Sequence, residues 1–585
     1  MPASLLLALI GCGGGGGSAA PPPSGNPPTP AVPAPPAPPP APAPTNRAPE
    51  IAQHLPPRQA IQFHAIDFEV TDGGRVFVDP DGDPLSYQVE VAAYSDPARP
   101  APGMSVIGTR VVGARQDTQQ LIITVTARDT AGATAVTQFS ILVAPNRPPQ
   151  SMTERQDRLV ELGQGFSFDA TAGRTFTDPD GDPITYAVTQ RGQAAVTVQG
   201  TQVSGQLDAV GAVEITLHAA DPYGASGEAV FVIAAPDAAT ATPTLPSTPF
   251  AYQDESLPLP DDFKLSSEIR LPLHDTQPTV NRTTDAGAAL GRVLFHDKRI
   301  SITNTAACVT CHVREHGFAS PERFNTGVLG VPLKRNSMAL ANARYNIHSS
   351  WFSDVRAFSI QEVARQALTN PEELGQTLPA LEQKLRATPF YGPMFEAAFG
   401  TPGITADRVL RALEQYVQAL ISYRTKYDQA CDTVGGVFKD CAQGLTAQEM
   451  RGLQLFTRPG GDEISCTNCH DLPSAANVWL ANNGIDVQFT DAGSGMGVFR
   501  PATLRNIALT APYMHDGRFA TLREVIDHYD HGIQASPFLD TRLRKQDGTA
   551  KRMDLPEEDK AALEAFLHTL TDDAMLSDPK FADPF

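Results

Sequence analysis

Two five-residue segments contain the side chains best suited to redox chemistry. The chain reads Cys-Val-Thr-Cys-His at residues 308–312 and Cys-Thr-Asn-Cys-His at residues 466–470. Two thiols at this spacing can bond to the two vinyl groups of one porphyrin, and the adjacent imidazole then reaches the iron. A redox dithiol or half of a zinc site is the alternative, but two chance matches in one chain are improbable. We therefore expect two covalent haem c groups, bonded to Cys308, Cys311, Cys466 and Cys469 and ligated by His312 and His470.

Helices with clear start signals and apolar faces surround the second segment. Thr446 and Glu449 form a capping box that predicts a helix over residues 447–456. A second helix is expected to begin near Pro556, and its apolar side chains share one face at i, i+3, i+4 and i+7. These side chains are Leu563, Phe566, Leu567 and Leu570. The context is typical of a small helical cytochrome unit.

Composition limits the classes of protein that the chain can belong to. With 585 residues it exceeds one ordinary core, so we expect three or more domains. The formal charge of −20 argues against a general nucleic-acid binder. Seven cysteines are too few for a disulfide scaffold. Cys431 and Cys441 remain as a pair, for which we predict a disulfide between the haem lobes, with two free thiols as the alternative.

The first 45 residues predict export and a spacer. A short apolar run precedes Gly11 and Cys12, and it is too short to span a bilayer. The run resembles a bacterial lipoprotein signal over residues 1–12 with Cys12 lipidated; a cleaved secretory peptide that loses Cys12 is the alternative. Because Gly13 replaces the Asp that retains lipoproteins at the inner membrane, we expect an outer-membrane lipid anchor facing the periplasm or the cell surface. Residues 13–45, rich in Gly, Pro and Ala, form an extended linker.

Two repeats of about a hundred residues follow, at 46–145 and 146–236. Phe-Val-Asp-Pro-Asp-Gly-Asp-Pro at 77–84 recurs as Phe-Thr-Asp-Pro-Asp-Gly-Asp-Pro at 176–183. Alternating apolar residues between Asp, Gly and Pro turns predict two all-β sandwiches. The motifs resemble cadherin-like, immunoglobulin-like domains of bacterial surface proteins, which implies spacer or adhesive modules. Residues 237–254 are the next linker.

The repeated acidic motif offers hard oxygen ligands. Such carboxylates suit Ca²⁺. The predicted ligands are Asp79, Asp81, Asp83, Asp178, Asp180 and Asp182. Alternatively, the motif is only a tight turn, since Asp, Gly and Pro each favour turns.

Residues from about 255 to 575 resemble the bacterial dihaem cytochrome c peroxidases, a family that includes MauG-type oxidases. The supporting stretches lie, in the family's order, at 290–297, 335–337, 369–373, 501–506 and 511–517. The resemblance implies a mainly α double domain, with the N-terminal peroxidatic haem in 255–430 and the C-terminal electron-transfer haem in 431–585. The whole chain is thus expected to be multidomain, with two all-β sandwiches followed by a mainly α dihaem cytochrome c-type part.

The resemblance also implies roles for particular residues. Peroxide reacts at the N-terminal haem, and the C-terminal haem relays electrons or stores oxidising equivalents. Glu373 becomes the distal carboxylate, which moves a proton between the two peroxide oxygens; a solvated charge is the alternative for Glu373, and its neighbour Glu372 is expected at the surface. One Ca²⁺ between the haems would be held by the Asn336 side chain and the carbonyls of Thr510 and Pro512.

The second axial ligand of the C-terminal haem distinguishes branches of the family. The peroxidase branch has Met at the position of Tyr529, and MauG-type proteins have Tyr. Helical spacing independently places Tyr529 on the apolar face of Leu522, Val525 and Ile526, with His528 solvated. Met514, a histidine, or a merely buried tyrosine remain alternatives. A phenolate favours higher iron oxidation states.

Other positions depart from the family. The histidine that blocks the resting first iron aligns with Val328, and no histidine lies between His316 and His348. We therefore expect an open first haem. The family's bridging Trp aligns with the position two residues after Trp351. The family's distal Gln and Pro align with Val363 and Ala367, so the peroxide pocket is expected to be less polar than in the family.

Three functions follow from these observations. The first is a dihaem peroxidase that takes electrons from a protein or small-molecule donor, or a MauG-like oxidase that modifies a partner protein. The second is a pure electron-transfer cytochrome, and the third is an adhesive protein whose sandwiches carry the role. If the chain is a peroxidase or a MauG-like oxidase, we expect deletion of residues 46–236 to leave the reaction with hydrogen peroxide intact.

Overall fold

A computed structural model describes residues 45–585 apart from 193–195, 254–276, 347–349, 435–436, 442–443, 461–462 and 471–479. The predicted signal peptide, Cys12 and nearly all of the first linker lie outside the described residues. The chain forms two compact units, Met1–Pro145 and Asn146–Phe585, and each is described by itself. Their boundary falls at the predicted end of the first sandwich.

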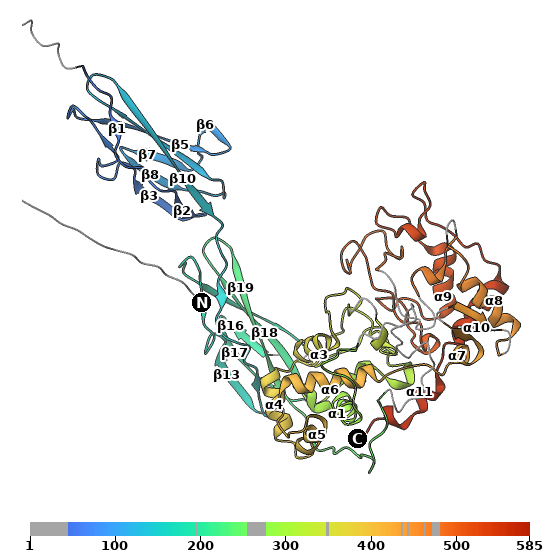
Figure 1. Cartoon of the computed structure of the whole chain (residues 1–585). Coiled ribbons are helices and arrows are strands. Elements are labelled where there is room, and N and C mark those ends of the chain that lie inside the picture. Colours follow the sequence, from blue (N-terminus) through green and yellow to red (C-terminus); the bar gives the residue numbers. More distant parts are fainter. Residues whose placement is uncertain are drawn as a thin grey trace, which may run out of the picture. The chain divides into compact units, whose positions relative to one another are not determined.

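The first unit is an all-β sandwich. Its main sheet has the order β2-β10-β9-β5-β6 and faces a three-stranded sheet β3-β8-β7, with a short pair β1-β4 (Figure 1). Alternate side chains of β9 are buried, as the sequence pattern predicts. The strands are β1 (Glu50–Ile51), β2 (Arg58–Ile61), β3 (Ala65–Glu69), β4 (Phe77–Val78), β5 (Ser86–Ala93), β6 (Asp96–Pro100), β7 (Met104–Ile107), β8 (Arg110–Ala114), β9 (Leu121–Arg128) and β10 (Thr134–Ala144).

The second unit begins with a similar sandwich. Its sheets have the orders β12-β19-β18-β15 and β13-β17-β16, with the pair β11-β14. The parallel pairing of β12 with β19 repeats that of β2 with β10. The strands are β11 (Gln150–Ser151), β12 (Arg158–Leu159), β13 (Gly165–Asp169), β14 (Phe176–Thr177), β15 (Thr185–Arg191), β16 (Val196–Gln199), β17 (Gln202–Gln206), β18 (Gly211–Ala220) and β19 (Ser226–Ala235). The N-terminal region is therefore all-β, as predicted.

The remainder of the second unit is mainly helical and has two helix-packed cores. The helices are α1 (Asp285–His296), α2 (Cys308–Cys311), α3 (Ile360–Thr369), α4 (Leu378–Arg386), α5 (Tyr391–Phe399), α6 (Ala406–Gln418), α7 (Lys426–Ala430), α8 (Ala447–Phe456), α9 (Leu522–Asp527), α10 (Glu557–His568) and α11 (Asp573–Ser577). One core joins α1 and α6, and the other joins α8 and α10. Figure 1 shows both pairs.

The two helix pairs have the same close contact. A Cβ on Gly291 of α1 would lie 2.0 Å from the Ala412 carbonyl oxygen of α6, and one on Gly452 of α8 would lie 2.0 Å from the Ala562 carbonyl oxygen of α10. Only glycine permits such an approach of two helix backbones. The helical region thus consists of two similar units, one around each Cys-x-x-Cys-His segment.

The helix signals of the second half are confirmed. Helix α8 begins after Thr446, whose side chain forms the capping box with Glu449. Helix α10 begins after Pro556. Its predicted apolar face is buried, with Phe566 fully inaccessible in the core.

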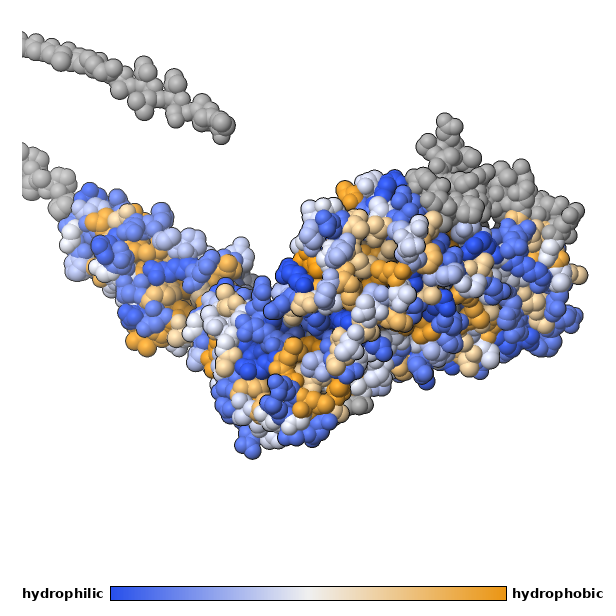
Figure 2. All heavy atoms as spheres, turned by 90° about the horizontal axis from the view of Figure 1, so that it is seen from below, coloured by the Kyte–Doolittle hydropathy of each residue, from blue (hydrophilic) through white to orange (hydrophobic). Residues whose placement is uncertain are grey.

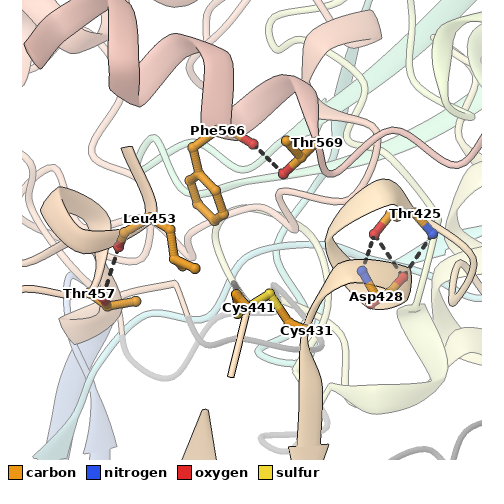
Figure 3. The surroundings of a disulfide bond; sticks show 8 residues. All are labelled: Thr425, Asp428, Cys431, Cys441, Leu453, Thr457, Phe566 and Thr569. Carbon is orange, nitrogen blue, oxygen red and sulfur yellow. Dashed lines mark hydrogen bonds between the residues drawn. A yellow bond between two sulfur atoms is a disulfide. The ribbon is translucent and has the colours of Figure 1, made fainter. Parts of the chain in front are cut away.

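Cys431 and Cys441 form a disulfide with a Cα–Cα distance of 4.2 Å. Figure 3 shows the bond beside the side chains of Leu453 and Phe566, which belong to the same core. The bridge closes a hairpin of β20 (Asp432–Val434) and β21 (Val437–Asp440). It therefore ties the segment between α7 and α8 to the core of the second helical unit.

Among the described residues, no helix combines the length and apolarity needed to cross a bilayer. On the face seen in Figure 2, hydrophilic and hydrophobic residues are interspersed.

Candidate haem sites

The first Cys-x-x-Cys-His segment forms a short helix that directs its histidine to a neighbouring carbonyl. Helix α2 contains Cys308 and Cys311, and Nδ1 of His312 lies 3.0 Å from the Phe318 carbonyl oxygen. Because a carbonyl only accepts hydrogen bonds, Nδ1 carries the proton and Nε2 keeps a free lone pair. Burial lowers the pKa of His312, so the ring is neutral, as an iron ligand must be.

A cavity of about 660 Å³ adjoins this histidine. Cys311, His312 and Glu373 all line it, together with the charged side chain of Arg356. Val363 and Ala367, the positions aligned with the family's distal Gln and Pro, line it too. The structure therefore brings the predicted proximal ligand and the predicted distal carboxylate to one cavity.

Glu373 lies on a tightly bonded loop that follows α3. The Asn370 side chain donates from Nδ2 to Oε1 of Glu373 at 2.9 Å, and its Oδ1 accepts from the Glu372 backbone at 3.0 Å. The Val328 N–H donates to the Glu373 carbonyl at 2.9 Å. Burial raises the pKa of the Glu373 carboxyl, while Asn370 and Arg356 lower it. A carboxyl of raised pKa in a cavity is suited to proton transfer near neutral pH.

Glu372, expected at the surface, lies at an exposed contact and has a charged partner there. Its carboxylate forms an ion pair with Arg191 at the end of β15, in the second sandwich. No sequence pattern points to this partner, because the two residues are far apart in the chain and no motif connects them.

The second Cys-x-x-Cys-His segment adjoins a more apolar cavity of about 260 Å³. Cys466 begins a short 3₁₀ turn, η6 (Cys466–Asn468), and both Cys469 and His470 line the cavity. Burial lowers the pKa of His470 to about 4. Its Nδ1 approaches the Ala502 carbonyl without reaching hydrogen-bonding geometry, unlike Nδ1 of His312. Its apolar lining residues include Phe456, Ile464, Leu504, Leu522, Ile526, Leu563 and Leu567.

Tyr529 and Met514, the rival axial ligands, both line this second cavity. Burial raises the pKa of Tyr529 to about 12, and a hydrogen bond from the Asn483 side chain lowers it. Nδ2 of the same Asn483 lies 3.5 Å from Sδ of Met514. Asn483 thus contacts both candidates, and no sequence spacing pointed to it.

The expectation that His528 is solvated is wrong. The residue is buried, its Nε2 lies 3.1 Å from the Asn483 carbonyl oxygen, and its ring packs against Phe519. Helix α9 ends at Asp527, and a π-helical turn, η8 (His528–Gly532), follows. A π turn has a wider spacing than an α-helix, so a 100° step per residue does not hold beyond Asp527.

A half-buried cation lies where the two cavities adjoin. Arg500 lines both cavities, its Nε has no hydrogen-bond partner among the described residues, and burial lowers its pKa to about 10. Its guanidinium lies 5.9 Å from the ring centroid of Trp351, which is buried. Nη2 of Arg500 lies 3.9 Å from Sδ of Met338, whereas a buried N–H without a partner, such as Nε, is costly. The guanidinium therefore fits an acidic group such as a haem propionate. The residues of both cavities therefore fit haem.

The predicted ligands of the inter-haem Ca²⁺ line a common cavity. Asn336, Thr510 and Pro512 all line the second cavity, and Asn336 also lines the first. The Asn336 backbone N–H donates to the His515 carbonyl at 2.8 Å. His348 lies outside the described residues, so the proposed openness of the first haem rests on the sequence.

In the sandwiches, the acidic motif is arranged differently from the expectation. Oxygen atoms of Asp178, Asp182 and Asp221 lie within 4.8 Å of one another. Asp180 instead accepts hydrogen bonds from Arg147, and Asp81 accepts the equivalent bonds from Arg47. Asp79 Oδ1 accepts from the backbones of Asp81 and Asp83, which is the bonding of a tight turn. Asp221, distant in sequence, thus takes the place expected for Asp180.

Comparisons with known proteins agree with this architecture. Residues 285–434 match the family model for di-haem cytochrome c peroxidase. The MauG protein of Methylorubrum extorquens is 29% identical over 317 residues, which are 52% of this chain and 84% of that protein. Cytochrome c551 peroxidase of Nitrosomonas europaea is 27% identical over 252 residues, 41% of this chain and 71% of that protein.

A solved MauG-like protein associated with microbial copper homeostasis superimposes with a TM-score of 0.46 at 28% identity, covering 54% of this chain and 98% of that one. The family match spans the first haem segment and the Glu373 loop. Residues 285–434 therefore match the di-haem cytochrome c peroxidase family, and the chain is similar in sequence to MauG proteins and cytochrome c peroxidases.

Proposed function

We propose that this chain is an exported dihaem oxidoreductase that reduces hydrogen peroxide at its N-terminal haem, with Glu373 as the proton-transfer group. The observation that carries the proposal is the convergence of His312 and Glu373 on one cavity within the family-matched segment. The bound haem iron supplies a site for peroxide and for electron transfer. Reduction to two waters consumes two electrons and two protons, which an external protein or small-molecule donor and solvent supply.

The residues around the first cavity have separate proposed roles in orienting the iron ligand and in transferring the proton. The Phe318 carbonyl fixes the His312 ring, which leaves Nε2 for the iron. Glu373 takes a proton from the near oxygen of peroxide and returns it to the departing oxygen as water. Asn370 holds Oε1 of Glu373, so the other carboxylate oxygen is left for the substrate. The apolar Val363 and Ala367 leave Glu373 as the main proton carrier of the pocket.

The second haem is proposed to relay electrons or to store oxidising equivalents. Its proposed ligands are His470 and Tyr529, which line one apolar cavity. Arg500 lines both cavities and Trp351 lines the first beside it, and we propose that both influence electron transfer between the haems. Ca²⁺ bound by Asn336, Thr510 and Pro512 belongs to this proposal, as does an outer-membrane lipid anchor at Cys12. A further Ca²⁺ in each sandwich is also part of the proposal.

The test is stopped-flow spectroscopy of the purified ferric holoprotein mixed with hydrogen peroxide. We expect a rapid change in the Soret band for the native protein and for Glu396→Gln, an exposed control on α5. Glu373→Gln is expected to lose most of that reaction. Equal rates for all three proteins would contradict the role of Glu373.

A MauG-like oxidase is the second candidate function. A tyrosine rather than a methionine at position 529, together with the MauG relatives, favours it. Rapid turnover of a reduced small cytochrome c with peroxide supports detoxification. A single oxidation by peroxide that persists without turnover supports modification of a partner protein.

A further inference from the structure

We propose that the second sandwich domain positions the Glu373 loop, with Arg155 as the main positioning residue. The inference rests on the proposed function, because Glu373 is the proton-transfer group proposed there. It gives a role to the second sandwich, which lies outside the segment matched by the family model. It concerns contacts within the second compact unit.

Arg155 joins the two ends of the loop. It lies between β11 and β12, and its Nη1 and Nη2 donate to the carbonyls of Thr369 and Gly375, each at 2.7 Å. Thr369 ends α3, and Gly375 follows Glu373 by two residues. One planar guanidinium therefore fixes the distance between the two ends of the segment that contains Glu373.

Arg155 is itself held by the sandwich. Its Nε donates to Oδ1 of Asp157 at 2.8 Å, and the same oxygen accepts from the Val232 backbone N–H of β19 at 2.8 Å. Since β19 is an interior strand of its sheet, the guanidinium is anchored to a strand that is paired on both sides. Arg191 adds a second contact through its ion pair with Glu372, beside Glu373.

The two sandwiches differ at the strand that makes this contact. The inner residues Ile141 of β10 and Ile233 of β19 occupy equivalent pairings with β2 and β12. The following residue, Leu142, is 50% exposed in the first sandwich, whereas Ala234 is 0% exposed in the second. Ala234 and Val232 belong to the core that contains α1 and α6. The last five residues of β19, 231–235, are thus buried on both faces, which a mere spacer does not require.

The consequence concerns proton transfer. A displacement of about 1 Å of a reacting group can cost on the order of a hundredfold in rate. Release of the loop from Arg155 would let the Glu373 carboxyl move relative to His312. Deletion of 46–236 would remove this restraint, so the expectation that it is harmless applies only to the first sandwich, 46–145.

The experiment compares Arg155→Gln with Arg158→Gln in the full-length holoprotein. Arg158 lies in β12 of the same sandwich and packs its guanidinium on Phe168. We expect Arg155→Gln to slow the reaction with peroxide about tenfold, Arg158→Gln to match the native rate, and Arg155→Lys to recover part of the loss. The EPR signal of the C-terminal haem should be unchanged in all three.

A double variant separates positioning from general damage. If Arg155 acts through Glu373, its substitution has no further effect in a Glu373→Gln background. A native rate for Arg155→Gln, or an additional tenfold loss in the double variant, would overturn the inference. Should Arg155→Gln lose haem, Arg191→Glu and Glu372→Arg provide the test instead. Each alone is expected to slow the reaction, and together they are expected to restore it; failure to restore it would count against the inference.

Cyanide association with the ferric N-terminal haem distinguishes this inference from the proposed function. Hydrogen cyanide must give up its proton on binding, so a positioned distal base accelerates it. If the native protein does not react with peroxide, the proposed function is wrong. The positioning role still predicts that Arg155→Gln slows cyanide association relative to Arg158→Gln. Equal cyanide rates in the two variants would overturn the positioning role alone.

Discussion

The two cavities share the Cys-x-x-Cys-His pattern and the same helix packing, yet they differ in what surrounds the histidine. The first is larger and contains Glu373, Arg356 and the orienting contact of His312 with Phe318. The second is smaller and mainly apolar, and it places Tyr529 and Met514 near His470. Under the proposed function, the first cavity suits a small polar substrate, and the second suits a haem with a protein ligand on each side. The surroundings of the motif, rather than the motif, separate the two roles.

The largest effect is expected from Glu373→Gln. The amide keeps the shape of the side chain but cannot accept the peroxide proton, so the second-order rate with peroxide should fall by about 10²- to 10⁴-fold. Stopped-flow measurement at neutral pH tests this, with the absorption of the C-terminal haem as the internal control. A fall of less than threefold would remove Glu373 from the mechanism.

The pH dependence of the rate with peroxide should show the ionisation of Glu373. Burial raises the pKa of Glu373 above its ordinary value of 4.5, so its carboxylate becomes protonated at a higher pH than a solvated one. Only the deprotonated form accepts a proton, hence the rate should fall about tenfold per pH unit below the raised pKa. The profile of Glu373→Gln should lack this limb. An acid limb that persists in the variant would assign it to another group.

Tyr529→Met should change the second haem and leave the first nearly unaltered. Axial ligands span roughly 0.8 V of haem potential, and replacing a phenolate by a thioether should raise the midpoint potential by on the order of 0.1 V or more. Spectroelectrochemistry measures the shift. Tyr529→Phe should alter the absorption of the same haem, and an unchanged spectrum would exclude Tyr529 as a ligand.

The smallest effect on the reaction is expected from the disulfide. Substitution of Cys431 and Cys441 by serine opens a short loop in the second core and should cost about 2–3 kcal/mol of stability. The rate with peroxide at the first cavity should stay within twofold of the native value. Thermal unfolding and stopped-flow kinetics check the two statements, and a large loss of rate would link the disulfide to the first cavity.

Local signals in the sequence predicted much of this fold. The Thr446–Glu449 capping box and the apolar face of α10 depend on residues a few positions apart, and the two haem segments are contiguous. The errors arose where distant segments meet or where the helix is irregular. His528 is buried because a π turn replaces the expected α-helical step. Asp221, Asn483 and Arg155 act on partners far along the chain, which no spacing reveals.

The contrast between the cavities is tested most directly by EPR spectroscopy of the resting, fully ferric holoprotein, with resonance Raman spectra of the same sample. A haem with His312 alone and an open side next to Glu373 gives a high-spin signal, whereas a haem with two protein ligands gives a low-spin one. The account predicts one high-spin and one low-spin haem in equal amounts. Two low-spin, six-coordinate haems would contradict it.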